Sequence, residues 1–146
     1  MYTHAQPSNY HFWHTEKTTA SPEAIWRVWT DVPQWKQWDT GLKEATLQGE
    51  FVEGVSGTLI PDKGPKSKFT ITLVLEGRQY TFQTNIPFGK LIITRSLEVK
   101  NGETFFTHEV AFAGLFKKIF GKTLGAKYRK MLPEVMQKVK AIAEQP

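Results

Sequence analysis

Residues 21–39 read SPEAIWRVWTDVPQWKQWD and hold four of the chain's five tryptophans. The segment starts with residues that favour a helix N-terminus. Ser21 can cap free N–H groups, Pro22 suits the first helical position, and Glu23 complements the positive helix end. Apolar residues then recur at the spacing of one helical face: Ile25, Val28, Trp29 and Val32. This half of the segment predicts a short amphipathic helix.

The second half of the segment predicts another short helical turn. Pro33 ends the first helix, and Trp35 and Trp38 follow three residues apart, on one face of the turn. Aromatic side chains in this arrangement either pack into a core or border a site for an apolar molecule. The rest of the chain has to decide between these alternatives.

The composition is that of one globular domain. The chain has 146 residues, of which 40% are hydrophobic and 23% charged, so it is long enough to bury a core. The absence of cysteine excludes a disulfide framework, a thiolate metal site and a cysteine nucleophile. There is no secretory-signal pattern and no apolar run of membrane-spanning length. We expect a cytoplasmic protein with a flexible tail at 1–10 and a single domain at 11–146.

Alternating apolar residues predict strands over most of the remaining chain. One strand covers 11–19, and six more cover 43–51, 55–60, 69–75, 78–86, 90–100 and 103–113. Asn101-Gly102 predicts a tight hairpin between the last two strands, because both residues tolerate a positive φ. In 69–75 the apolar residues have odd numbers throughout, and in 78–86 Tyr80, Phe82, Thr84 and Ile86 share one face.

One long helix is predicted over 115–144. Its apolar stripe comprises Phe116, Phe120, Leu124, Tyr128, either Met131 or Leu132, Val135, Val139 and Ile142. Gly121 and Gly125 weaken the start of this helix. Pro133 predicts a kink, because proline has no N–H for the carbonyl of residue 129.

This order of elements resembles the START-like superfamily, and in particular its polyketide cyclase/dehydrase branch. The resemblance rests on ASPEAIW at 20–26, VPQWKQW at 32–38 and the long terminal helix, and it extends over about residues 12–144. It implies the α+β helix-grip fold, in which a curved seven-stranded antiparallel sheet wraps around the C-terminal helix and leaves an apolar cavity. Relatives of this kind bind lipids, hormones or quinones, or catalyse cyclisation or dehydration, so the fold alone does not define the function.

The resemblance assigns different positions to the tryptophans. It packs Trp26 and Trp29 of the first helix against the sheet, as scaffold. It sets Trp35 and Trp38 beside the cavity mouth, where both core packing and a pocket rim stay open.

A few polar side chains share faces with apolar ones. Side chains two residues apart in a strand lie on one face. Arg95 therefore groups with the apolar residues of 90–100, and His108 with those of 103–113. The resemblance turns Glu16 and His14 to the same side and makes the first, seventh and sixth strands neighbours. Glu16 or His14, His108 and Arg95 are thus predicted to lie on one wall of the cavity.

A buried guanidinium needs a carboxylate partner, and two partners are open for Arg95. One is Glu16, in an internal ion pair beside a satisfied His108. The other is an acidic or enolate oxygen of a ligand, with His108 or Glu16 as general base. These three residues are the candidate catalytic residues.

The remaining candidate ligand-binding residues lie on faces that the resemblance turns toward the cavity. They are His14, Trp35, Trp38, Tyr80, Phe82, Phe106, Phe120, Leu124 and Tyr128. The hydroxyl groups of Tyr80 and Tyr128 can donate to a ligand carbonyl or to a buried partner.

No cofactor or metal is predicted. His11 and His14 point to opposite faces of a strand, so they do not chelate one ion. Gly121-Lys122-Thr123 resembles the end of a phosphate-binding loop, but that motif needs a glycine at position 116, which is phenylalanine.

The net charge of +5 is concentrated in residues 114–146, which carry +6 while the rest carries −1. The basic residues are scattered around the predicted helix, which favours a solvated face over a binding surface. We expect a monomer or homodimer that binds a small apolar ligand with an acidic or aromatic part, of lipid or polyketide type, without nucleic acid or stable membrane insertion. The alternatives are a cyclase or dehydratase, and an interaction module that uses the basic helix.

Overall fold

The computed structural model describes residues 6–146, and residues 1–5 of the predicted flexible tail lie outside the described residues. The last residues of the tail segment contact the domain. Arg129 Nη1 donates to the Asn9 carbonyl over 2.8 Å, and the Phe112 N–H donates to the Tyr10 carbonyl over 2.8 Å. The bounds of the tail and of the domain stay predictions.

A single antiparallel sheet and a long helix make up most of the described chain. The strands are β1 (His11–Thr18), β2 (Leu42–Leu47), β3 (Ser56–Pro61), β4 (Ser67–Leu75), β5 (Gln79–Ile86), β6 (Gly89–Lys100) and β7 (Glu103–Gly114). Their order in the sheet is β1-β7-β6-β5-β4-β3-β2. The helices are α1 (Pro22–Thr30), the 3-10 helix η1 (Val32–Gln37), α2 (Lys117–Lys122) and α3 (Leu124–Ala143).

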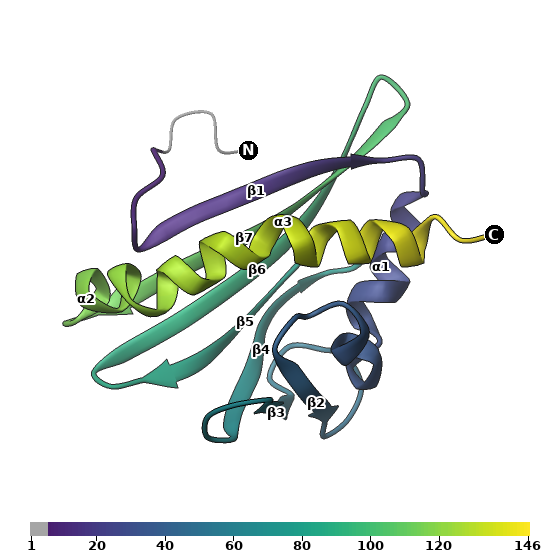
Figure 1. Ribbon diagram of the computed structural model, residues 1–146. Coiled ribbons are helices and arrows are strands. Elements are labelled where there is room, and N and C mark those ends of the chain that lie inside the picture. Colours follow the sequence, from purple (N-terminus) through teal and green to yellow (C-terminus); the bar gives the residue numbers. More distant parts are fainter. Residues whose placement is uncertain (1–5) are drawn as a thin grey trace.

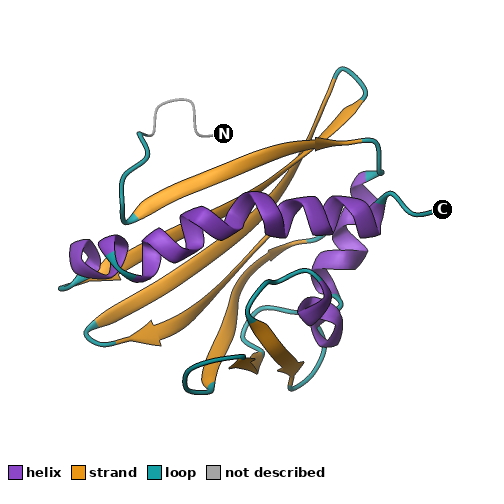
Figure 2. Cartoon of the chain, viewed as in Figure 1, coloured by secondary structure: helices purple, strands orange, loops and turns teal. Residues whose placement is uncertain are grey.

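The curved sheet wraps around α3, which lies along one of its faces (Figure 1). Helices α1 and η1 lie at the end of the molecule where α3 finishes, and β2 and β3 form the short edge of the sheet beside them (Figure 2). This arrangement confirms the predicted α+β helix-grip fold. Within residues 6–146, no helix is long and apolar enough to cross a bilayer.

The predicted start of α1 and the predicted hairpin at Asn101-Gly102 are both confirmed. Ser21 Oγ accepts a hydrogen bond from the Ala24 N–H over 3.1 Å. Asn101 and Gly102 have φ angles of 52° and 77°, the positive pair that a tight two-residue hairpin needs.

The alternation predicted for residues 69–75 is wrong beyond Ile71. The register shifts between Ile71 and Leu73, so Val74 pairs with Tyr80 and packs on the core, whereas Leu75 is 44% exposed. A bulge inserts one residue and thereby reverses which side chains face inward. The predicted strand 43–51 is also too long, because β2 ends at Leu47.

The predicted single terminal helix is interrupted at Thr123, and the kink predicted at Pro133 stays a prediction. Thr123 has φ −90° and ψ −80°, outside the helical region, whereas α3 continues through Pro133. Gly121 lies so close to the N-terminal segment that a Cβ there would come within 2.7 Å of the Asn9 carbonyl oxygen. Glycine is unfavourable inside a helix because its backbone is free to adopt other conformations. Together with the close contact at Gly121, this accounts for the break two residues later.

The tryptophan-rich segment forms the centre of the core. Trp29, Trp35 and Trp38 are at most 1% exposed, and Trp26 is 8% exposed. The indole N–H of Trp35 donates to the Trp29 carbonyl over 2.8 Å, which ties η1 to α1. Both short helices therefore act as scaffold, and Trp35 and Trp38 are core residues as well.

Candidate functional site

A row of polar side chains crosses the inner face of the sheet. His14 in β1 pairs with His108 in β7, His108 pairs with Arg95 in β6, and Arg95 pairs with Tyr80 in β5. Directly opposed residues of an antiparallel pair project from the same face. The register therefore brings His108 and Arg95 together in the middle of the sheet, as the strand parity predicts.

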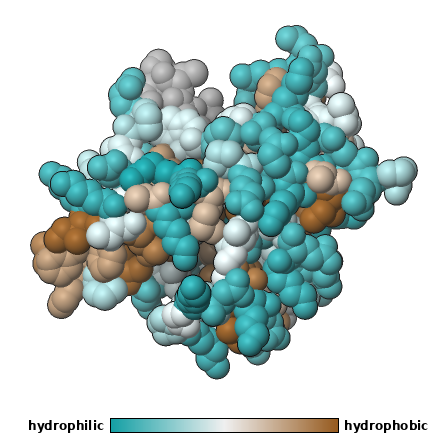
Figure 3. Space-filling model, in the orientation of Figure 1, coloured by the Kyte–Doolittle hydropathy of each residue, from teal (hydrophilic) through white to brown (hydrophobic). Residues whose placement is uncertain are grey.

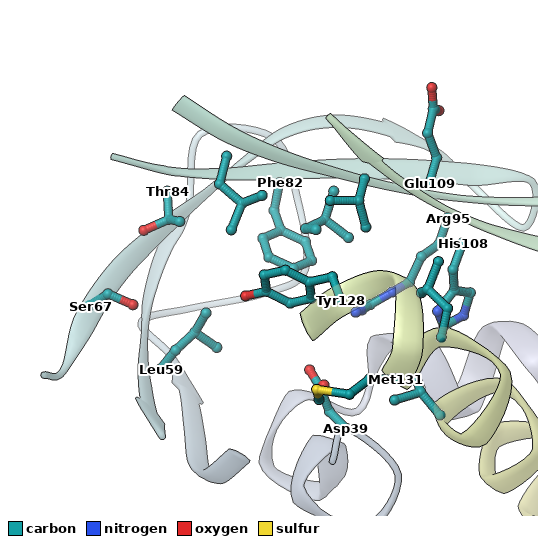
Figure 4. A pocket seen from close by; sticks show the side chains of 15 residues that line it. Asp39, Leu59, Ser67, Phe82, Thr84, Arg95, His108, Glu109, Tyr128 and Met131 are labelled. Carbon is teal, nitrogen blue, oxygen red and sulfur yellow. The ribbon is translucent and has the colours of Figure 1, made fainter. Parts of the chain in front are cut away.

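A cavity lies between this face and α3 (Figure 4). Its inner chamber has a volume of about 110 Å³ and a mainly apolar wall. The polar side chains on the wall are Asp39, Ser67, Thr84, Arg95, His108 and Tyr128. Glu109 borders the chamber too, but its side chain points away from it and bonds His11 instead (Figure 4).

An outer chamber of about 350 Å³ continues from the inner one. The two chambers share wall residues that include Leu59, Tyr128 and Met131. The outer chamber lies between the β3–β4 connection, the end of β5 and the start of α3. Lys63 and Lys127 are on its wall. The inner chamber alone is smaller than the cavities of about 150 Å³ that bind benzene, so it suits a head group rather than a whole ligand.

Arg95 is held in an aromatic cage, and no carboxylate of residues 6–146 forms an ion pair with it. Its side chain is 4% exposed, and its guanidinium carbon lies 4.7–5.7 Å from the ring centroids of four aromatic residues. These are Trp35, Trp38, Tyr80 and Phe82. Arg95 Nη1 donates to the Tyr80 hydroxyl over 2.6 Å, whereas the buried Nε has no hydrogen-bond partner among residues 6–146. Cation–π contacts offset part of the desolvation of this charge and leave a donor free.

Of the two partners left open for Arg95, Glu16 does not form the ion pair in this structure. Glu16 pairs with Phe106 in the sheet, and Phe106 with Leu97, so Glu16 belongs to the row beyond Arg95. Its carboxylate instead accepts from His14 Nε2 over 2.8 Å. Strand parity gives the face of Glu16 correctly, but only the register decides which residue lies opposite.

Asp39 is the carboxylate that sequence reasoning missed. It follows η1, is half-buried, and lies on the wall of the inner chamber (Figure 4) and on that of the outer chamber. Burial raises its pKa, and the positive charge of Arg95 offsets part of the rise. The two side chains form no salt bridge. Asp39 lies in a connection between elements, where neither helical nor strand periodicity assigns a direction to a side chain. The sequence therefore carries no periodic signal for it.

His108 is neutral and already engaged through one ring nitrogen. It is 2% exposed, and its Nε2 accepts the indole N–H of Trp29 over 3.0 Å. Burial holds its pKa well below the usual value, and the charges of Arg95 and His14 lower it further. Since Nε2 is the acceptor, the ring proton is on Nδ1.

Tyr128 brings a hydroxyl group from α3 to the junction of the two chambers. Burial raises its pKa to about 12, with a further contribution from the charge of Asp39, so the hydroxyl stays protonated at neutral pH. It points toward the side of the cavity that carries Ser67 and Thr84 (Figure 4).

The candidate residues divide into those on the cavity wall and those behind it. Arg95, His108, Phe82 and Tyr128 line the inner chamber, and Leu124 lines the outer one. His14, Glu16, Trp35, Tyr80, Phe106 and Phe120 line neither, and Trp38 lines a separate groove beside Ile142. Trp35, Trp38 and Tyr80 still contribute to the site, because they surround Arg95.

The buried neutral state of His108 predicts a stability that falls in mild acid. Below a pH of about 6.5 the unfolded chain protonates this histidine and the folded chain does not. The contribution of His108 to the free energy of unfolding is therefore fully present above this pH and is lost as the pH falls below it. We expect the free energy of unfolding in urea to drop by about 1 kcal/mol between about pH 7.5 and about pH 5.5 on account of His108.

His108→Gln removes this titrating group and should flatten that part of the pH dependence. His11→Gln serves as the matched control, because His11 is half-buried on the outer face of the sheet. It should leave the contribution of His108 in place. Equal slopes in wild type and His108→Gln would contradict a depressed pKa at His108.

The fold and the cavity define a START-like helix-grip protein, a class with a ligand-binding architecture. The chain belongs to the polyketide cyclase/dehydrase and lipid transport family, whose model matches residues 11–144. The match covers nearly the whole chain and confirms the predicted family. No curated protein sequence matches this chain significantly.

Solved structures support the fold at low sequence identity. A protein from Arthrobacter aurescens has a TM-score of 0.72 and 16% identity, over 100% of this chain and 94% of its own. The major latex-like protein 151 from Panax ginseng has a TM-score of 0.74 and 13% identity, over 92% of this chain and 97% of its own. A hypothetical protein from Helicobacter pylori has a TM-score of 0.77 and 6% identity, over 98% of this chain and 93% of its own. Identities this low establish a shared fold alone.

Proposed function

We propose that the cavity binds one small molecule that has an apolar body and an acidic head group. In this proposal the head group enters the inner chamber and accepts hydrogen bonds from Arg95, and the body fills the outer chamber. The observation that carries the proposal is the buried Arg95 Nε, which has no partner among the described residues. A buried donor without an acceptor costs free energy, and a ligand oxygen would recover it.

The volumes of the two chambers support this orientation. About 110 Å³ beside Arg95 and His108 suits a carboxylate and its first carbon atoms, and about 350 Å³ toward the solvent suits an aliphatic or aromatic body. Asp39 lines the same chamber and would lie close to the head group. Because its pKa is raised, its protonated form can donate to the same ligand oxygen rather than repel it.

His108 fits a binding role better than that of a general base. Its Nε2 accepts from Trp29, and its remaining ring nitrogen carries the proton. A base must offer a free lone pair to the proton that it abstracts. A cyclase or dehydratase activity that uses His108 stays a prediction without support from this arrangement.

Thermal melting with matched acid and amide probes tests the proposed function. The probes are octanoate with octanamide, and 3-phenylpropanoate with 3-phenylpropanamide, because each pair differs only in the charge of the head group. A ligand that binds only the native state raises the melting temperature by mass action. We expect the acids to raise it and the amides to raise it less. Equal shifts for acid and amide, or no shift with any probe, would contradict the proposal.

A further inference from the structure

The end of the molecule that carries α2 exposes an apolar surface. Four large side chains from the β5–β6 turn, the end of β7 and α2 form it: Phe88, Leu115, Phe116 and Ile119, which we call the apolar tip. They are 75%, 75%, 36% and 60% exposed. The rings of Phe88 and Phe116 meet edge to face at 5.6 Å. Figure 3 shows hydrophobic side chains gathered at this end of the molecule.

The backbone holds Phe88 outward at a cost in strain. Phe88 has a φ of 59°, a left-handed conformation that favours glycine or asparagine over a bulky residue. Its carbonyl accepts from the Leu115 N–H over 3.1 Å. Gly114 permits this approach, since a Cβ there would lie 2.2 Å from the Phe88 oxygen. The turn and the end of β7 are therefore fixed together with their apolar side chains in solvent, and strain of this kind concentrates at functional sites.

The segments around the apolar tip carry only positive charge. No Asp or Glu occurs between Glu76 and Glu98 or between Glu109 and Glu134. The lysines near the tip along the chain are Lys90, Lys117, Lys118, Lys122 and Lys127. Lys118, Lys122 and Lys127 are exposed, and the other two are half-buried. Apolar side chains that protrude among lysines are complementary to a surface with anionic groups above an apolar layer.

The tip adjoins the mouth of the cavity. Asn85 and Ile86, just before the β5–β6 turn, line the outer chamber, and so do Leu124 and Lys127, just after α2. A surface that covers the tip therefore lies next to the opening of the cavity.

We propose that the apolar tip docks the protein peripherally on an anionic lipid bilayer, with Phe88 and Ile119 in the interfacial layer and the lysines against acidic head groups. A bilayer accepts both parts of this surface at once. Nucleic acid would use the lysines and leave the protruding Phe, Leu and Ile side chains in water. The proposal is independent of the proposed ligand in the cavity.

Co-sedimentation of the full chain with vesicles tests this proposal. The vesicles consist of phosphatidylcholine alone or of phosphatidylcholine with about 30% phosphatidylserine, at about 0.1 M and about 0.5 M salt. We expect binding to the anionic vesicles that weakens at high salt. Phe88→Asn and Ile119→Ser should each weaken it about tenfold, and Lys118→Gln and Lys122→Gln about fivefold each. Asn suits the left-handed backbone at position 88, so a thermal melt should find that variant folded.

Val99→Asn is the matched control, because Val99 is a 57% exposed apolar residue close to the β6–β7 hairpin at the other end of β6. It should bind vesicles as the wild type does. Three results would overturn the proposal: no binding to either vesicle, equal binding by wild type and Phe88→Asn, or self-association without lipid that Phe88→Asn abolishes. The last result would assign the tip to contact between two copies of the chain.

Discussion

Replacing Arg95 with methionine is expected to leave the protein at least as stable as the wild type and to remove its preference for acidic ligands. Among residues 6–146, the buried Arg95 makes one side-chain hydrogen bond, forms no ion pair and has an unpartnered Nε. Replacing a buried charge with an apolar side chain is often neutral or stabilising. We expect the free energy of unfolding to fall by less than about 1 kcal/mol or to rise.

The same variant should weaken the binding of octanoate by about tenfold to a hundredfold, because hydrogen bonds to charged groups contribute about 1.5–3 kcal/mol. The affinity for octanamide should fall less than that for octanoate. Arg78→Met is the matched control, since Arg78 is an exposed arginine just before β5. It should change neither stability nor binding. A large loss of stability at Arg95→Met with acid binding intact would assign Arg95 a structural role instead.

Trp29→Ala should destabilise the protein by about 3–5 kcal/mol, measured by urea denaturation. Trp29 is fully buried, and its ring meets those of Trp26, Tyr80, Phe106 and His108 at centroid distances of 5.6–6.4 Å. The substitution leaves a cavity among these rings and removes the hydrogen bond to His108. Because the free energy of unfolding of a small domain is about 5–15 kcal/mol in total, this loss is a large share of it.

Trp13→Ala controls for the loss of a tryptophan as such. Trp13 is half-buried in β1 and pairs with Glu109. It is the neighbour of the inward-facing His14, so its side chain lies on the outer face of the sheet. Its removal should cost about 1–2 kcal/mol. Similar losses at both positions would contradict the central role that we assign to the tryptophan-rich segment.

The sequence predicted the fold well because local signals and the resemblance agreed along the chain. The cap at Ser21, the Asn101-Gly102 turn and the parity of β5, β6 and β7 all depend on near neighbours in sequence. Parity also identified Arg95 and His108 as inward polar residues. Both indeed line the inner chamber.

The sequence could not provide the contacts that depend on register and on connections. Glu16 has the right parity but lies one row away from Arg95. The bulge in β4 reverses the side on which Val74 and Leu75 point, and no residue type in that strand marks it. The exposed state of the apolar tip was also missed, because Phe116 has the same helical spacing as the buried stripe.

The side-chain ¹H–¹⁵N NMR signal of Arg95 Nε tests most directly whether an acidic head group accepts a hydrogen bond from Arg95. Burial protects this N–H from exchange, and the Arg95→Met variant assigns its signal. An acidic head group that accepts from Nε would shift the signal on addition of octanoate, and octanamide would shift it less. We predict this difference. If octanoate perturbs signals of the cavity wall and leaves that of Arg95 Nε unchanged, the acidic group does not bind at Arg95, which contradicts the proposed function.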